Sequence, residues 1–138
     1  MHVFLKSTNP KLSDNFTGNE FHCQCKSLEC HKTWVSDSLI TKLQAVRDDF
    51  GEGIIITSGY RCASHQASLR TNPLLKTASG KSTHEMGCAV DIRPVNLTTE
   101  NMDELLVVLG RHFKSIGLAI NFFHVDTRLD KDKRRWKY

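Results

Sequence analysis

The 138-residue sequence has no long apolar run and no apolar segment near its N-terminus. No stretch approaches the roughly 18 consecutive apolar residues that a membrane-spanning helix needs, so we expect no insertion into a membrane. Residues 1–9 also lack the apolar region of a secretory signal peptide. We therefore expect synthesis and retention in the cytoplasm, and a target beyond the membrane would require another agent to let the protein across.

Internal repeats and low-complexity segments are absent too, and only 3 residues are proline. Hydrophobic residues account for 39% and charged residues for 25% of the chain, which is typical of a globular protein and excludes collagen-like and disordered classes. The length suits one compact core. We expect a single domain over residues 1–138, with an irregular segment rich in Cys and His at residues 1–35.

Neither sign of charge dominates, because the formal net charge is +4 and the isoelectric point is about 8.9. Part of the positive excess lies in the tail from Arg128 to Lys137, where Asp130 and Asp132 dilute it. A basic surface favours nucleic acid or an anionic cell wall as a partner. We prefer a solvated tail of mixed charge, and we expect a monomer with no nucleic-acid partner.

The cysteine count is odd, so the 5 thiols cannot all pair within one chain. Cys23, Cys25 and Cys30 lie close together, and a reducing cytoplasm favours free thiols or metal ligands over disulfides. With Cys62 as a distant fourth ligand, they are candidates for a second metal site that holds a structural zinc. The single residue between Cys23 and Cys25 departs from the usual spacing of about two to four, so packed free thiols are the alternative. We expect Cys88 to be a small core residue.

Helical periodicity is clearest in two segments of the sequence. The first runs from a cap at Ser36 or Asp37 to about residue 49, and Gly51 ends it. The second is predicted over residues 98–115, with Gly117 as its terminator. Apolar side chains recur at helical spacing in both segments, so each helix is expected to bury one face.

Short strands are predicted between these helices. The β-branched run Ile54–Thr57 is typical of a buried strand, and residues 88–92 and 118–126 are predicted as two more. A short helix over residues 63–70 and a polar loop over residues 71–83 connect the first two strands. This order predicts an α+β fold in which a small, mainly antiparallel sheet is flanked by helices.

A metal-binding pattern surrounds the second predicted strand. His84 and Asp91 lie seven residues apart, and Gly87 permits a tight turn before the chain continues as a strand that presents Asp91. His124, on the last predicted strand, is available as a third ligand. Two imidazoles and one carboxylate leave the fourth position of a tetrahedral zinc open for water, as a catalytic site requires.

The spacing of these residues also matches a known motif. Ser82–Ile92 follows the pattern S-x-H-x-x-G-x-A-x-D and resembles the zinc D-alanyl-D-alanine carboxypeptidases and related murein endopeptidases, including phage endolysins. The resemblance extends to Ser58–Arg61, to His124–Arg128 and to Trp136, and covers about residues 20–136. It implies the fold that these peptidases share with Hedgehog-type signalling domains.

The resemblance assigns roles to individual residues. It implies a zinc site whose ligands are His84, Asp91 and His124. It implies that Arg61 binds a substrate carboxylate or carbonyl and steadies the oxyanion, which suits the planar fork of a guanidinium; a structural ion pair is the alternative. Ser82 is expected to bind substrate or to stabilise its own turn, and Gln66 to line the same cleft.

The general base is less clear from the sequence. Several members of the family carry an acidic residue three positions before the last zinc histidine, where this chain has Asn121, which cannot take up a proton. Asp126 lies two residues after His124, so both side chains project from the same face of a strand. We expect Asp126 to act as the base or as a carboxylate that orients the water; the alternative is that Asp126 binds zinc and His124 is the base.

Three functions compete on this basis. The first is a zinc peptidase that hydrolyses peptide bonds in peptidoglycan stems, either as a carboxypeptidase or as an endopeptidase, and the small size and basic isoelectric point favour a phage endolysin. The second is a non-catalytic module that binds cell-wall peptide on the same scaffold. The third, a nucleic-acid-binding protein built on the cysteines and the basic tail, leaves the motif unexplained.

Overall fold

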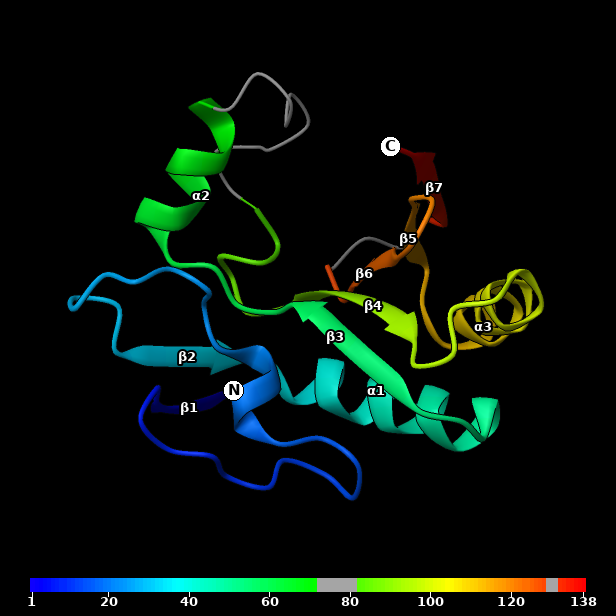
Figure 1. The fold of residues 1–138 in the computed structure, drawn as a ribbon, viewed down its shortest axis with the longest axis horizontal. Helices are drawn as coiled ribbons and strands as arrows, with labels where there is room; N and C mark the ends of the chain where they lie inside the picture. The colour runs from blue at the N-terminus through cyan, green and yellow to red at the C-terminus, as the bar shows by residue number, and fades with distance from the viewer. Residues whose placement is uncertain (72–81, 129–131) are drawn as a thin grey trace.

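The chain forms two β-sheets and three α-helices over residues 1–71, 82–128 and 132–138, which are the residues that the computed structural model describes (Figure 1). The predicted loop at residues 71–83 lies largely outside them. None of the helices in these ranges has the length and apolar character that crossing a bilayer requires.

The larger sheet has five strands. Its strands are, in spatial order, β3 (Ile54–Ser58), β4 (Ala89–Pro94), β6 (Phe123–Asp126), β5 (Ser115–Leu118) and β7 (Arg134–Lys137). The first four pair antiparallel to their neighbours, and only β7 runs parallel to β5. The predicted α+β fold with a small, mainly antiparallel sheet is confirmed.

Two helices cover one face of this sheet (Figure 1). Helix α1 (Asp37–Phe50) begins at Ser36, whose side chain accepts a hydrogen bond from the Leu39 amide, and it ends at Gly51, whose φ of 74° favours glycine. Helix α3 (Thr99–His112) packs against α1 and β4. The apolar stripes of both helices meet the inward side chains of the sheet in one core.

The alternation of side chains along the strands separates the core from the opposite face of the sheet. Val90 and Ile92 of β4 and Val125 of β6 are fully buried in the core beneath the helices. Asp91, between Val90 and Ile92, and His124, which precedes Val125, therefore point away from the helices. The polar side chains of the central strands thus gather on the face that α1 and α3 leave free.

The N-terminal segment is more regular than the sequence predicts. β1 (His2–Leu5) and β2 (Lys32–Val35) form a separate antiparallel pair, and the 3-10 helix η1 (Gly18–Phe21) lies between them in the sequence. η1 starts with a capping box of Thr17 and Glu20. The prediction of an irregular segment was wrong at the two ends of the segment, because β1 pairs with a strand almost thirty residues away, which no local pattern reveals.

The boundaries around α3 also differ from the prediction. The helix ends at His112, and Phe113 already has extended backbone angles, φ −119° and ψ 136°. Residues 115–118 form strand β5, so Gly117 lies within a strand and does not terminate the helix. Phe113 and Ile116 are buried, but they reach the core from the chain after the helix. Apolar spacing alone does not show whether such side chains are buried from a helix or from the strand that follows it.

The C-terminal end contains two further corrections. The predicted strand over residues 118–126 is the end of β5, a connection and then β6. The tail predicted to be solvated has mostly exposed side chains, but its residues 134–137 form β7 at the edge of the sheet, where Trp136 packs directly on Gly117. Only one side chain of β7 is partly buried, and the others are exposed and charged. The sequence of such an edge strand therefore looks like that of a solvated tail.

Candidate metal centre

Three segments bring the predicted metal ligands together. Asp91 of β4 and His124 of β6 are directly paired residues of the antiparallel ladder, so their side chains emerge side by side. His84 lies in the turn before β4, where Gly87 adopts a φ of 72°. A Cβ atom at Gly87 would lie 2.5 Å from the carbonyl oxygen of Trp34, so this close approach of the two backbones also requires glycine.

The three ligand atoms form a nearly equilateral triangle. His84 Nε2 lies 3.2 Å from His124 Nδ1 and 3.3 Å from Asp91 Oδ1, and His124 Nδ1 lies 3.2 Å from the same oxygen. Ligands at about 2.0–2.1 Å from a tetrahedral zinc are about 3.3–3.4 Å apart, so one zinc ion fits this triangle. All three residues are buried.

Hydrogen bonds on the far side of each ring determine which nitrogen faces the centre. His84 Nδ1 lies 2.8 Å from the carbonyl oxygen of Gly59 and donates to it, so Nε2 carries the lone pair. His124 Nε2 lies 2.8 Å from Asp126 Oδ2, so its Nδ1 is the free nitrogen. When both rings are neutral, as in metal-binding histidines, two lone pairs only 3.2 Å apart repel each other unless a cation lies between them.

Asp126 lies behind His124. Its carboxylate accepts hydrogen bonds from Ser115 Oγ at 3.0 Å and from Arg128 Nε at 2.8 Å, and its side chain has no exposed surface. Burial raises the pKa of Asp126, but the hydrogen bonds from Arg128 and His124 outweigh burial and hold this pKa below its ordinary value. The carboxylate is therefore ionised, and it contacts His124, Ser115 and Arg128.

Arg61 lies beside the triangle. Its Nη2 is 3.3 Å from Asp91 Oδ2, the carboxylate oxygen that the two histidines do not contact, and its Nε donates to Ser58 Oγ at 3.2 Å. Gln66 is almost completely buried, and its Oε1 is 3.5 Å from Arg61 Nη1. Gln66 thus supports Arg61 from behind. Burial also raises the pKa of Asp91, but hydrogen bonds with His124 and His84 outweigh it and keep the pKa low.

Ser82 contacts the turn that carries His84. Its Oγ accepts a hydrogen bond from the His84 amide at 3.1 Å, and the side chain is buried. Of the two roles considered for this residue, the contact is that of a serine that stabilises its own turn.

Other contacts of the centre have no signal in the sequence. The Gly59 carbonyl and the Ser115 hydroxyl belong to residues that no spacing rule connects with His84 or Asp126. Trp136 is part of the family resemblance, and the centroid of its ring lies 5.3 Å from that of His124. Arg128 lies over the indole, with its Cζ 5.7 Å from the ring centroid. These contacts enclose His124 on the side of β7.

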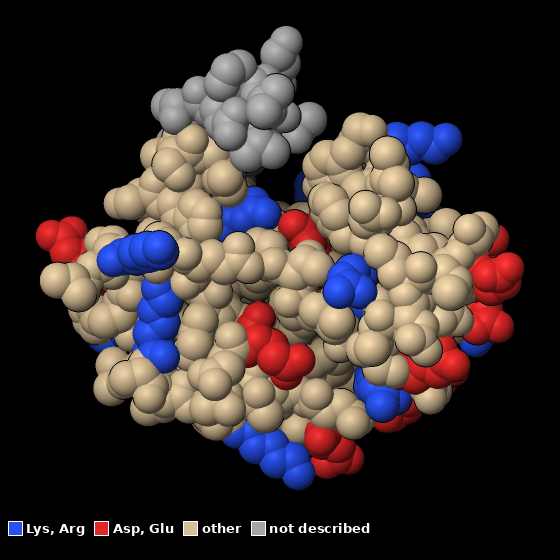
Figure 2. Space-filling view, viewed as in Figure 1, with Lys and Arg blue, Asp and Glu red and all other residues tan. Residues whose placement is uncertain are grey.

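The surface above this face of the sheet is hollowed. Figure 2 shows a depression between the part of the molecule formed by α2 (Ala63–Thr71) and the part formed by β5 and β7, with basic and acidic side chains exposed on its floor. Beside β7, an indentation is lined by Arg128, Trp136 and residues 133–135.

The predicted second metal site also converges. The Sγ atoms of Cys23, Cys25, Cys30 and Cys62 all lie within 4.8 Å of one another. Cys62 approaches the other three from the start of α2. All 5 cysteines are free thiols, and Cys88 is a buried residue apart from this group, as predicted.

Comparison with known proteins agrees with the geometry. No curated protein matches the chain significantly. The family model described as peptidase M15 matches residues 14–126, a span that contains both groups of potential ligands and every residue proposed for the site except Arg128 and Trp136. The chain therefore belongs to the peptidase M15 family, the family of the zinc D-alanyl-D-alanine carboxypeptidases.

Proposed function

We propose that this peptidase is a zinc enzyme that hydrolyses peptide bonds in the stem peptides of bacterial peptidoglycan. The observation that carries the proposal is the triangle of His84 Nε2, His124 Nδ1 and Asp91 Oδ1, whose edges of 3.2–3.3 Å match three corners of a zinc tetrahedron. A bound zinc ion supplies a Lewis acid and lowers the pKa of water to about 7. Family membership supports the reaction class, and the substrate is our inference.

The residues around the triangle have separate tasks in this proposal. Asp126 holds the ring of His124 by the hydrogen bond to Nε2, and this fixes the nitrogen that binds the ion. Because its oxygens accept bonds from Ser115 and Arg128 as well, we assign Asp126 this orienting role instead of that of a base. The alternative in which Asp126 binds zinc is not adopted, because its carboxylate lies on the far side of the His124 ring.

Arg61 is the substrate-binding residue of the proposal. Its guanidinium lies against Asp91 at the edge of the triangle and is partly exposed, so it has further N–H groups to donate. A planar guanidinium binds a carboxylate through two parallel hydrogen bonds. It can also stabilise the oxyanion that develops while an amide is hydrolysed. Stem peptides offer both groups, and the cell wall is therefore the proposed place of action.

The test is digestion of purified peptidoglycan and of synthetic stem peptides, with mass spectrometry of the products. We expect the zinc-loaded protein to release defined fragments, and we expect a chelator or the His84→Ala substitution to abolish release. His112→Ala is the matched control. His112, the last residue of α3, contacts Asp49 of α1 and belongs to neither ligand group. Intact substrate after incubation with the zinc-loaded protein would refute the proposal.

The contacts of Asp126 favour a second function, namely binding of cell-wall peptide without cleavage. Its carboxylate, expected from the sequence to be a base, is engaged on three sides, and Asn121 cannot replace it. A protein without a base would bind cell-wall peptide without cleaving it. Co-sedimentation with the same peptidoglycan tests this function, which predicts that the protein sediments with the wall in a manner that depends on His84 and that no fragments are released.

A further inference from the structure

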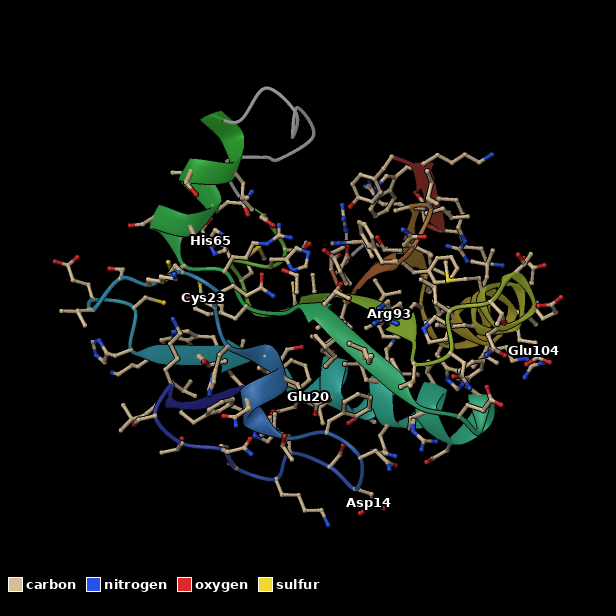
Figure 3. The ribbon with its side chains drawn as sticks, in the orientation of Figure 1. Asp14, Glu20, Cys23, His65, Arg93 and Glu104 are labelled. Carbon is tan, nitrogen blue, oxygen red and sulfur yellow. The ribbon has the colours of Figure 1, made fainter. Side chains whose placement is uncertain are left out.

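Four cysteine thiols that the proposed reaction does not use meet at the base of α2. Cys23, Cys25 and Cys30 come from the loop between η1 and β2, and Cys62 comes from the residue before α2. Figure 3 shows Cys23 directed toward His65 of α2, and its Sγ lies 3.3 Å from His65 Nδ1. The group therefore joins two parts of the chain that are distant in sequence.

The distances between the sulfur atoms distinguish a metal site from disulfides. Cys62 Sγ lies 3.7 Å from Cys23 Sγ and 3.6 Å from Cys25 Sγ. A disulfide requires about 2.05 Å, whereas sulfur atoms at about 2.3 Å from a tetrahedral zinc are about 3.8 Å apart. We propose that Cys23, Cys25, Cys30 and Cys62 bind a second zinc ion, whose role is structural.

The surroundings supply what a zinc ion with four thiolates needs. Such a site carries a net charge of −2, and Lys6 Nζ lies 3.7 Å from the Sγ atoms of both Cys25 and Cys30. The Cys62 amide donates to Cys23 Sγ and the His65 amide donates to Cys62 Sγ, both at 3.4 Å. Hydrogen bonds from backbone amides to coordinating thiolates are the usual support of a metal site.

The second site lies against the structure that shapes the first. The Tyr60 amide donates to the carbonyl oxygen of Phe21 at 2.9 Å, and the backbone of Gly59 packs on that of Phe21. Gly59 accepts the hydrogen bond of His84, and Cys62 follows Arg61 directly. An ion held by Cys23 and Cys62 therefore fixes the loop that orients one ligand and carries the substrate-binding arginine.

A structural ion would also stabilise the cysteine loop, which has little apolar core of its own. Residues 22–31 between η1 and β2 contain no helix or strand, and the chain in this region has few buried apolar side chains. Metal coordination stabilises such short segments, because the free energy of binding becomes free energy of folding. All four sulfur atoms belong to the described residues and lie within 4.8 Å of one another, close enough for all of them to bind one ion.

Metal analysis of purified protein tests this inference separately from the proposed function. We expect about two zinc ions per chain in the wild type and about one in both His84→Ala and the double variant Cys25→Ala/Cys30→Ala. Cys88→Ala is the matched control and retains both ions, because Cys88 lies apart from the group. A wild-type protein with a single zinc that only His84→Ala removes would overturn the second site.

Cobalt substitution gives a measurement that does not depend on how the cysteine variants fold. In the His84→Ala protein, Co²⁺ bound to four thiolates produces an intense sulfur-to-cobalt charge-transfer band in the near ultraviolet, and we expect this band to persist. Its absence from cobalt-loaded wild type and His84→Ala would overturn the inference. So would intramolecular disulfides among the four residues in protein purified without oxidant. Loss of hydrolysis alone, with both metal signals intact, concerns the proposed function only.

Discussion

At the scale of single residues, the metal centre depends on the hydrogen bonds that orient its histidines. Asp126 fixes His124 through Nε2, so Asp126→Asn replaces an ionised acceptor with an amide of the same shape. We expect zinc to bind about 10–100-fold more weakly while the fold is retained. Competition with a chromophoric chelator measures this affinity. Asp103→Asn on the exposed side of α3 is the control, and equal zinc affinity in both variants would contradict the orienting role.

Arg61 permits a second test at the same scale. Arg61→Lys retains the charge but loses the planar fork, so we expect kcat/KM for stem peptides to fall about tenfold or more with an unchanged zinc content. Arg93→Lys is the matched control, because the Arg93 guanidinium donates to the Pro94 and Val95 carbonyls at the end of β4 (Figure 3). If both variants hydrolyse the peptides like the wild type, Arg61 has only a structural ion pair with Asp91.

The sequence predicts the ligands better than it predicts their supports. His84, Asp91 and His124 stand in a motif whose spacing reflects a turn followed by a strand, and the structure brings these residues together. The Gly59 carbonyl and Ser115 hydroxyl have no such signal, since a backbone carbonyl is common to every residue. Their roles arise from the packing of β3 and β5 beside β4 and β6, which only the folded chain defines.

At the scale of elements, η1 and the turn after β3 approach each other backbone to backbone beside the proposed metal centre. A Cβ atom at Gly59 would lie 2.6 Å from Phe21 Cα and 2.8 Å from its carbonyl oxygen. We expect Gly59→Ala to lower the free energy of unfolding by about 1–3 kcal/mol, because backbone atoms must shift. Urea denaturation measures the change.

Gly110→Ala in α3 provides the comparison for that measurement. A Cβ atom at Gly110 meets nothing within 4 Å, and the residue lies inside a helix. We expect this substitution to stabilise the protein by about 0.5–1 kcal/mol, since alanine loses less conformational entropy in a helix than glycine. A Gly59→Ala protein as stable as the wild type would show that the two segments do not pack as described.

Elements with local signals were predicted closely, and elements that depend on distant partners were not. α1 has its serine cap, apolar stripe and terminal glycine within one stretch of the sequence, and its predicted bounds are nearly those observed. β1 and β7 have no comparable local pattern. β1 depends on pairing with β2, and β7 on pairing with β5, and such pairing is decided by the topology of the whole chain.

At the scale of the whole molecule, the large sheet separates stability from chemistry. Its one face, covered by α1 and α3, contains the apolar core, whereas Asp91, His124 and Asp126 lie on the other. Polar ligands thus gather without interrupting the core. The two proposed ions would connect the sheet with segments that have little apolar core of their own, namely the turn at His84 and the cysteine loop.

Removal of metal is therefore expected to destabilise the molecule as a whole. A ligand that binds only the folded state contributes about 2.7 kcal/mol at a free concentration 100-fold above its Kd. We expect a chelator to lower the Tm and added zinc to restore it, as followed by circular dichroism. An unchanged Tm in chelated protein, with loss of both ions verified by metal analysis, would contradict this.

The most direct test of the account is anomalous diffraction at the zinc absorption edge from crystals of the zinc-loaded protein. The account predicts a peak about 2.0–2.1 Å from His84 Nε2, His124 Nδ1 and Asp91 Oδ1, with the fourth position left to solvent or substrate. A zinc ion bound through other atoms, or no peak between these three side chains, would contradict it.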